Sequence, residues 1–324
     1  MELTGLHHLS AITAQAPQNV DFYTRLLGMR LVKKTVNQDD PSSYHLFYGD
    51  ELGRPGTELT FFDIPYAAPT KPGTGSISRT ALRVTGREAL EFWRQRLDES
   101  GVEVDEISTE GQRAVLTFRD FEGQRLAFID DEDAPLPGGI PWQRSAAPVE
   151  MGIKGLASVT LTVADAQPTV RVLTDVMGFG EQGRYRAQNP DREIRVFGAG
   201  VGGPGAELRV DERPDLQPER LGRGGVHHVA FRVPNEEEHN KWLDRLSAAG
   251  IGNSGIIDRF YFRSIYFREP NGILFELATD GPGFATDEDE EHLGESLALP
   301  PFLEPHREQI EANLQPLEVQ ATQN

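Results

Sequence analysis

The sequence has 324 residues, of which 38% are hydrophobic, with 33 glycines, 22 prolines and no cysteine. This length allows two domains, and the lack of cysteine excludes disulfides, thiolate metal sites and a cysteine nucleophile. Histidine and carboxylate side chains are therefore the only strong metal ligands available. The net charge of -19 argues against nucleic acid as a partner, because phosphate binding needs a basic surface. We interpret the charge as a solvated acidic surface, with adaptation to high salt as the alternative.

The sequence gives no indication of a membrane partner. No continuous apolar run approaches 18 residues, and the first residues lack a basic stretch followed by an apolar one. We therefore predict a cytoplasmic protein. The sequence leaves open whether it forms a homo-oligomer.

Four stretches of the chain repeat one unit, which is a strand, a helix and then several short strands. The first unit is predicted to have a strand from residue 5, a helix at 17–27 and strands at 29–34, 44–48 and 57–62. The second has a strand at 77–84, a helix at 87–99 and a strand at 125–129. The third has a strand at 156–163, a helix at 168–176 and a strand at 206–210. The fourth has a strand at 226–233, a helix at 236–249 and a strand at 273–278. A glycine follows each helix, as is typical of a helix end.

The helix endings indicate that one unit was duplicated twice. Units one and three share one ending, at 26–29 and 176–179, whereas units two and four share another, at 93–101 and 242–250. We predict an α+β fold of four βαβββ modules in two paired-module domains. The domains are 1–130, with modules at 5–63 and 76–130, and 151–280, with modules at 153–211 and 224–280. Residues 131–150 are predicted to be a linker and 281–324 an acidic tail, whose segment 299–317 packs on a domain or on a partner subunit.

Laying the four units over one another isolates the residues that could bind a metal. The equivalents of His8 are Arg79, Ser158 and His228, and the equivalents of Glu276 are Thr60, Ala127 and Arg209. If units one and four share a cavity, it offers His8, His228 and Glu276, with Thr60 at a fourth corner. Two imidazoles and one carboxylate with other positions open form the facial triad of non-haem Fe(II) enzymes. We predict one metal site, for Fe(II) or Mn(II).

This arrangement resembles the vicinal oxygen chelate superfamily of paired βαβββ modules, and within it the hydroquinone-type ring-cleaving dioxygenases. The similarity covers about residues 3–280 and includes the segments 6–8, 22–28, 44–46, 50–57, 226–228 and 275–276. The resemblance implies that the metal ligands are His8, His228 and Glu276. It also implies that the residues beside the metal or the substrate are His7, His227, Arg259 and Tyr266. The chain has Ser10 where that family can place a threonine.

Several of these residues have a simpler interpretation. His7 and His227 point away from the metal if the strands alternate, and either pack in the core or support the ligands. Arg259 and Tyr266 form an ordinary strand-surface pair, or attract and hydrogen-bond a phenolate. The remaining histidines are predicted to lie on the surface: His45, His239, His292 and His306. The charged run 287–291 is predicted to be a solvated loop rather than a cation site.

The function predicted from these residues is a ring-cleaving dioxygenase that inserts O2 into a dihydroxylated aromatic substrate at an Fe(II) site. His227 is the expected acid and base, because imidazole titrates near neutral pH. One alternative is a glyoxalase-like lyase or thiol transferase that uses a divalent metal as a Lewis acid, although Thr60 disfavours the four-ligand glyoxalase I site. Another is a non-catalytic protein that binds aromatic compounds. The sequence does not distinguish a hydroquinone from a catechol.

Overall fold

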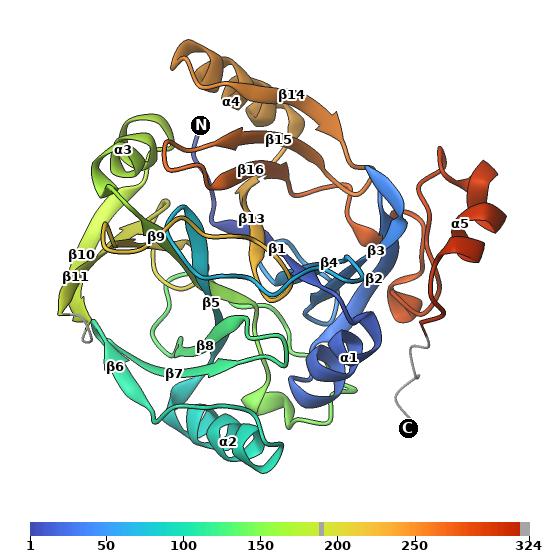
Figure 1. Cartoon of the computed structure of the whole chain (residues 1–324), viewed down its shortest axis with the longest axis horizontal. Helices are drawn as coiled ribbons and strands as arrows, with labels where there is room; N and C mark the ends of the chain where they lie inside the picture. Colours follow the sequence, from blue (N-terminus) through green and yellow to red (C-terminus); the bar gives the residue numbers. More distant parts are fainter. Residues whose placement is uncertain (188–190, 318–324) are drawn as a thin grey trace.

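The computed structural model describes residues 1–187 and 191–317. Within them, strands β1 to β16 belong to one hydrogen-bonded sheet, and helices α1 to α4 lie around its outside (Figure 1). Four βαβββ modules follow one another along the chain. The predicted α+β class and the fourfold repeat are therefore confirmed.

The modules have the following bounds, and in the first and third the helix continues as a π-helix. Module one contains β1 (Leu6–Thr13), α1 (Ala16–Val20), the π-helix Asp21–Leu26, β2 (Arg30–Asn37), β3 (Asp40–Gly49) and β4 (Glu58–Asp63). Module two contains β5 (Ser76–Val84), α2 (Gly86–Glu99), β6 (Ser108–Glu110), β7 (Arg113–Arg119) and β8 (Arg125–Asp130). Module three contains β9 (Leu156–Val163), α3 (Ala166–Arg171), the π-helix Val172–Val176, β10 (Gly180–Ala187), β11 (Arg192–Gly198) and β12 (Glu207–Glu212). Module four contains β13 (Val226–Val233), α4 (Glu236–Ala248), β14 (Asn253–Asp258), β15 (Arg263–Arg268) and β16 (Leu274–Thr279).

Local signals in the sequence explain where the helices begin and end. The side chain of Asn235 caps α4 by accepting a hydrogen bond from the backbone N–H of Glu238 at 2.9 Å. After the helix, Gly250 has a φ of +71°, a conformation that glycine adopts without steric cost. On the buried side, Trp93 of α2 and Trp242 of α4 occupy equivalent positions and are 0% and 1% exposed. The helices thus cover the outer face of the sheet with repeated apolar side chains.

The sheet joins modules that are not consecutive in the chain. In each module the last strand runs parallel to the first, as in β1 with β4 and β13 with β16. Between modules, β1 pairs antiparallel with β13, and β5 pairs antiparallel with β9. Among the described strands, β1–β4 make no ladder with β5–β8, and β9–β12 make none with β13–β16. Modules one and four therefore share one half of the sheet and modules two and three the other. The division of the chain at residues 131–150 stays a prediction.

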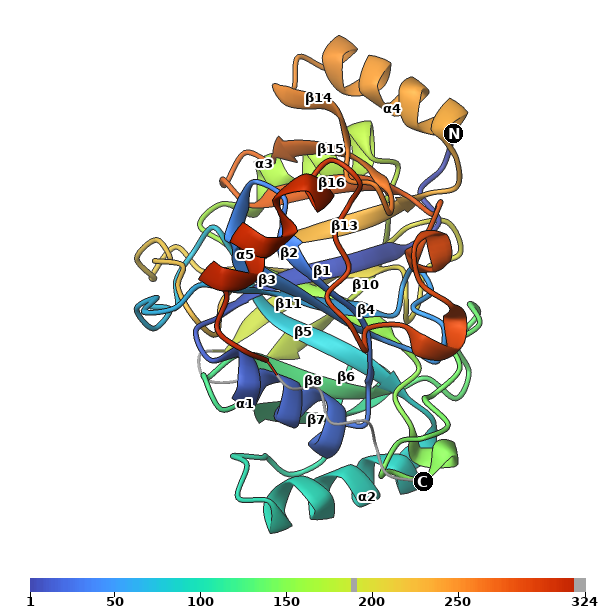
Figure 2. The same ribbon diagram turned by 90° about the vertical axis from the view of Figure 1, so that its right-hand side faces the viewer.

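The tail packs on module one. It contains short 3-10 turns (Phe284–Thr286, Glu290–His292 and Glu304–His306) and helix α5 (Arg307–Asn313), which lies outside β2 and β3 (Figure 2). The Tyr44 hydroxyl donates to the carbonyl of Gln315 at 2.9 Å. The tail therefore covers its own chain as far as residue 317, and residues 318–324 lie outside the described part.

The charged run 287–291 is not simply a solvated loop, so that prediction is wrong at its first two residues. Lys33 of β2 is 0% exposed, and its Nζ lies 2.7 Å from Asp287 Oδ1 and pairs also with Glu288. The same ammonium donates to the carbonyl of Phe284 at 3.0 Å. A buried cation needs such partners, because an unpaired charge is costly to bury. The run therefore anchors the start of the tail.

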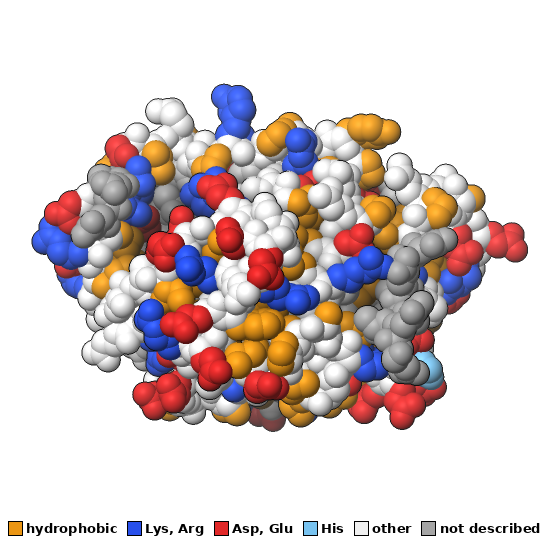
Figure 3. Space-filling model, turned by 90° about the horizontal axis from the view of Figure 1, so that it is seen from below, with side chains coloured by type: hydrophobic (Ala, Val, Ile, Leu, Met, Phe, Trp, Pro, Cys, Tyr) orange, Lys and Arg blue, Asp and Glu red, His pale blue; other side chains and the backbone are white. Residues whose placement is uncertain are grey.

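The surface is mixed in charge on the face that Figure 3 shows, where acidic and basic side chains are interspersed. Among the described helices, none is both long and apolar enough to cross a membrane.

Candidate metal centre

Three buried side chains from modules one and four converge at the junction of β1, β13 and β16. His8 and His228 are 1% and 4% exposed, and Glu276 is 0% exposed. The two Nε2 atoms are 3.3 Å apart, and Glu276 Oε2 lies 3.2 Å from His8 Nε2 and 2.9 Å from His228 Nε2. The pairing of β1 with β13, which sets Ser10 opposite His228, brings these side chains together from opposite ends of the chain.

The spacing of these three atoms fits one divalent ion. Ligand atoms about 2.1 Å from a first-row metal and at right angles to each other are about 3.0 Å apart. All three separations are close to that value. Glu276 Oε2 is buried and, among the described residues, has no hydrogen bond of normal geometry. Glu58 Oε2 also lacks one, but Glu276 Oε2 lies within 3.2 Å of two imidazole nitrogens, where a cation shared with them would satisfy it.

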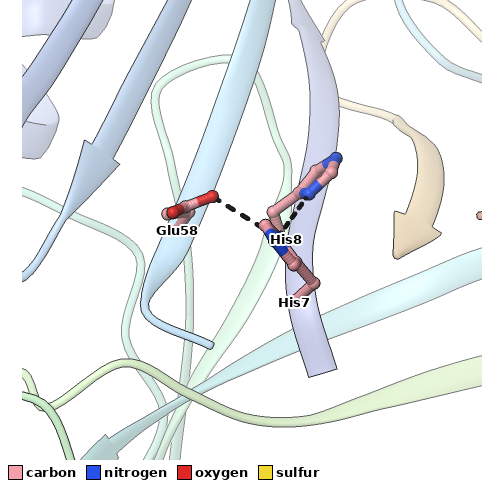
Figure 4. A group of neighbouring side chains, drawn as sticks. All are labelled: His7, His8 and Glu58. Carbon is pink, nitrogen blue, oxygen red and sulfur yellow. Dashed lines mark hydrogen bonds and ion pairs between the residues drawn. The ribbon is translucent and has the colours of Figure 1, made fainter. Parts of the chain in front are cut away.

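A second cluster lies beside the first but fits a metal less well. It consists of His7, His8 and Glu58, with the two histidines on β1 and the glutamate on the neighbouring β4 (Figure 4). Glu58 Oε2 is 3.7 Å from His7 Nδ1, which is longer than the separation of about 3.0 Å expected for two ligands at right angles. Burial raises the pKa of Glu58 well above its usual value, with the charge of Asp50 adding to the effect. A raised pKa disfavours the charged form that binds a cation, so the first cluster fits a metal better.

Each predicted ligand histidine is held by the histidine that precedes it. The Nδ1 atoms of His8 and His7 are 3.0 Å apart, and those of His228 and His227 are 2.8 Å apart. With Nε2 bound to a metal, the ligand carries its proton on Nδ1 and donates it to the neighbouring ring. His7 then donates from Nε2 to the carbonyl of Thr279 at 3.1 Å. His7 and His227 thus contact the two predicted ligands through Nδ1 and are placed to support them.

Burial keeps these two supporting histidines neutral. Loss of solvent, with a smaller effect from the adjacent His8, lowers the pKa of His7 well below its usual value. Loss of solvent and the neighbouring His228 lower the pKa of His227 to about 4. A neutral ring can accept a hydrogen bond at Nδ1, as the arrangement requires.

Two contacts fix the carboxylate of Glu276. Ser264 of β15 donates to Oε1 at 2.5 Å, which turns Oε2 towards the two histidines. Burial alone would raise the pKa of Glu276, but its interactions with His8 and His228 outweigh burial and hold the pKa well below its usual value. The group is therefore an anion, which is the form that binds a cation.

A cavity lined mainly by aromatic and polar side chains opens onto His8 and His228. Its walls come from β2, β3, β4 and β15 and from two loops, and include His8, Val36, Asp39, His45, Phe47, Phe62, His228, Arg259, Tyr261, Phe262 and Tyr266. His7 and His227 are not among the lining residues. Phe262 packs on the rings of His7 and His8, with centroids 5.3 Å and 5.1 Å away. The lining therefore has the chemistry of a site for a small aromatic molecule.

Arg259 and Tyr266 lie in this cavity and not on an open strand surface. Arg259 Nε is 3.3 Å from the Tyr266 hydroxyl, and its two terminal nitrogens pair with Asp39 at 3.0 Å and 2.9 Å. Because the tyrosine oxygen accepts from Arg259, its own hydrogen can point to a ligand. Burial raises the pKa of Tyr266, so the phenol stays protonated.

Two histidines predicted to lie on the surface do not: His239 is buried and His45 is half-buried. His45 lines the cavity, with its ring between those of Phe47 and Phe62 at centroid distances of 4.0 Å and 4.2 Å. His239 is 0% exposed and its Nε2 lies 2.9 Å from the carbonyl of Leu277. The alternation of β3 contained the signal for His45, because that residue shares a face with Phe47. His292 and His306 are exposed, as predicted.

The sequence matches a known protein superfamily in both halves of the chain. A family model, described as the glyoxalase/bleomycin resistance protein/dioxygenase superfamily, matches residues 5–128 and 155–277. The chain belongs to this superfamily. The matched ranges are the two halves of the chain that each contain two modules.

Several members of the superfamily are similar to the chain over nearly its whole length. MhqA of Bacillus subtilis (strain 168), which carries the provisional name of a ring-cleaving dioxygenase, is 51% identical over 98% of this chain and 100% of its own. The chlorohydroquinone/hydroquinone 1,2-dioxygenase of Sphingobium indicum is 33% identical over 94% of both chains.

Solved structures of the superfamily share the fold. A crystal structure from Bacillus subtilis, provisionally named a dioxygenase, has a TM-score of 0.89 and 35% identity and covers 98% of this chain and 99% of its own. Glyoxalase I from Zea mays has a TM-score of 0.62 and 14% identity, and covers 85% of this chain and 92% of its own. At this identity the likeness supports the fold alone. The superfamily is metal-dependent, and His8, His228 and Glu276 could bind a metal.

Proposed function

We propose that the protein is a ring-cleaving dioxygenase that acts on a hydroquinone-type diol, with Fe(II) held by His8, His228 and Glu276. The observation that carries the proposal is the buried Oε2 of Glu276, which lacks a hydrogen bond and lies 2.9 Å and 3.2 Å from two imidazole nitrogens beneath an aromatic-lined cavity. The names of the relatives support the choice of reaction. Mn(II) suits the same ligands.

Fe(II) held by His8, His228 and Glu276 would supply the electron transfer between the diol and O2 that ring cleavage requires. Thr60 adds no ligand, because its hydroxyl is engaged with Ser10 at 2.7 Å and His45 at 2.9 Å. Asp39, the carboxylate among the described residues of the cavity lining, is paired with Arg259 and so adds no ligand either.

Tyr266 and Arg259 would orient the diol. The phenol of Tyr266 can donate a hydrogen bond to a substrate oxygen, while Arg259 holds that phenol in place. The pair with Asp39 offsets much of the charge of Arg259. Arg259 is therefore a positioning residue in this proposal, and Tyr266 is the residue that touches the substrate.

His45 is the group best placed to move a proton, instead of His227. Its Nε2 is fixed by Thr60, whereas its Nδ1 has no hydrogen bond among the described residues and is not sealed from the cavity. Loss of solvent, followed by the nearby His8 and His228, lowers the pKa of His45 well below its usual value. A neutral imidazole that faces the cavity can accept the proton of a diol as it binds.

Replacing Tyr266 by phenylalanine is expected to lower kcat/KM for a hydroquinone by about 10-fold to 100-fold, because one hydrogen bond to a charged oxygen is lost. The change retains the ring, so the fold should be intact. Steady-state oxygen uptake measures the effect. Phe262→Leu, which alters the same cavity without removing a donor, is the comparison, and an equal loss in both variants would argue for simple packing.

Replacing His45 by glutamine is expected to lower kcat by about 100-fold, within the usual range for removal of a general base, while metal binding is unchanged. The glutamine amide reaches the position of the imidazole Nε2 and can still donate to Thr60, so the Ser10 to Thr60 contact remains supported. The pH dependence of kcat gives a second readout: the variant should lose dependence on a group that titrates in the acid range. Full activity in the variant would exclude His45 from the reaction.

The proposed reaction is tested by loading the protein with Fe(II) without air and then adding oxygenated buffer with methylhydroquinone, catechol or a glutathione hemithioacetal. We expect oxygen uptake in step with the loss of the hydroquinone. Isomerisation of the hemithioacetal without oxygen uptake would support a glyoxalase-like lyase instead. Binding of the diols with no turnover would support a non-catalytic protein.

A further inference from the structure

A second cavity, of about 340 Å³, lies at the junction of the modules and shares no lining residue with the metal cavity. Four cationic side chains line it, namely Arg54, Arg83, Lys154 and Arg232, and its lining contains no Asp or Glu. The whole chain has 51 acidic and 32 basic residues. A cationic wall without carboxylates is therefore a local reversal of the charge of this protein.

Two of the cations are equivalent residues of the repeat. Arg83 and Arg232 are the second-last residues of β5 and β13. Arg83 Nε pairs with Asp131 at 3.0 Å, and Arg232 binds Asp280 through Nε and Nη2 at 2.9 Å and 2.8 Å. Each aspartate follows closely on the last strand of its module, and neither lines the cavity. These pairs fix the two guanidinium groups in the cavity wall.

The two arginines differ in what their remaining nitrogens do. Arg83 donates from Nη1 and Nη2 to the carbonyls of Pro137 and Leu136 at 3.1 Å and 2.7 Å, which ties down the linker. The Nη1 of Arg232 makes no hydrogen bond within the described part of the chain. It lies 3.8 Å from the position that a Cβ on Gly56 would occupy. Arg232 therefore keeps one N–H group for a ligand.

The other two cations have little acidic compensation. Arg54 is 42% exposed, and its contact with Asp50 is 3.8 Å long, which is beyond hydrogen-bond range. Lys154 Nζ donates to the hydroxyl of Thr85 at 2.5 Å and makes no ion pair in the described ranges. Both side chains can turn towards a ligand, and each would add a charged donor.

We propose that this cavity binds a small phosphate-type dianion through Arg232, Arg54 and Lys154. Three charged donors in the lining of one cavity match the several acceptor oxygens of such an anion, and hydrogen bonds between charged partners are the strong ones. No carboxylate of the lining would repel the ligand. The site is separate from the metal centre, so it stands independently of the proposed reaction.

Titration of inorganic phosphate into the full-length, metal-loaded protein tests this site, with ionic strength held constant by sodium chloride. We expect saturable binding by calorimetry, and a loss of affinity of about tenfold or more in Arg54→Gln/Lys154→Gln. Both residues are partly exposed, so the double variant should fold, and circular dichroism and oxygen uptake check that it does. The matched control is Arg87→Gln/Lys241→Gln, which removes the same charge from two outer helices and should bind phosphate as the unaltered protein does.

Two results would overturn the proposal. One is the absence of saturable phosphate binding to the unaltered protein. The other is an equal loss of affinity in the two double variants, because this would mean that phosphate binding depends only on the net charge of the protein.

Discussion

Replacement of His228 by alanine is expected to abolish both metal binding and oxygen uptake with a hydroquinone. The side chain supplies one of three ligand atoms, at 3.3 Å from His8 Nε2 and 2.9 Å from Glu276 Oε2. Removal of a residue that merely supports a ligand costs about 10-fold to 100-fold in affinity or activity, and loss of a ligand should exceed that. Metal analysis after anaerobic loading and an oxygen electrode measure the two quantities.

The matched control is His306→Ala, because His306 is exposed in the tail. That variant should retain its metal and its full rate. If His228→Ala instead retained the metal and lost only the rate, His228 would not be a ligand. If His228→Ala retained both the metal and the rate, the reaction would not take place at the site between modules one and four.

Replacement of Lys33 by alanine should lower the free energy of unfolding by about 3 kcal/mol, as is usual when one partner of a buried ion pair is removed. The ammonium is 0% exposed and also lies 4.7 Å from the centre of the Tyr261 ring, which lines the metal cavity. Without it, Asp287 and Glu288 lose their counter-charge. Urea unfolding followed by fluorescence gives the change.

The comparison for this prediction is Lys241→Ala on α4. Lys241 pairs with Glu237 and Glu238 at 2.8 Å, but its side chain is 48% exposed, and such surface pairs contribute about 1 kcal/mol or less. A Lys33 variant no less stable than this control would mean that the tail is not anchored by the buried lysine. Lys33→Met, which keeps most of the buried volume, separates the loss of charge from the loss of packing.

Much of the fold could be predicted because the signals are local and repeated. Glycines after the helices and the equivalent tryptophans Trp93 and Trp242 mark the same unit in different places. Alignment of the four units in the sequence was enough to identify His8, His228 and Glu276 as candidate ligands, without any three-dimensional contact. The expectation that these three converge depended on units one and four sharing a cavity, and the pairing of β1 with β13 brings them together.

Other features depend on contacts between distant segments, which no local pattern reports. In the sequence, His45 and His239 have the pattern of polar residues in amphipathic elements. In the structure, the His45 ring lies between Phe47 and Phe62, and His239 forms a hydrogen bond with the carbonyl of Leu277 in β16. Likewise, a run of acidic residues is typical of a solvated loop, and the sequence alone does not show that the buried Lys33, 254 residues earlier, pairs with it. The pairing of modules one and four across the chain is set by tertiary packing, and propensity does not encode it.

The central claim is that modules one and four hold one metal ion between them, and anaerobic Fe(II) titration by equilibrium dialysis tests it most directly. We expect one ion per chain, with a comparable and severe loss of affinity in His8→Ala, His228→Ala and Glu276→Ala and none in Glu58→Gln. Binding that survives the Glu276 substitution but is lost in Glu58→Gln would place the ion in the neighbouring cluster and contradict this account.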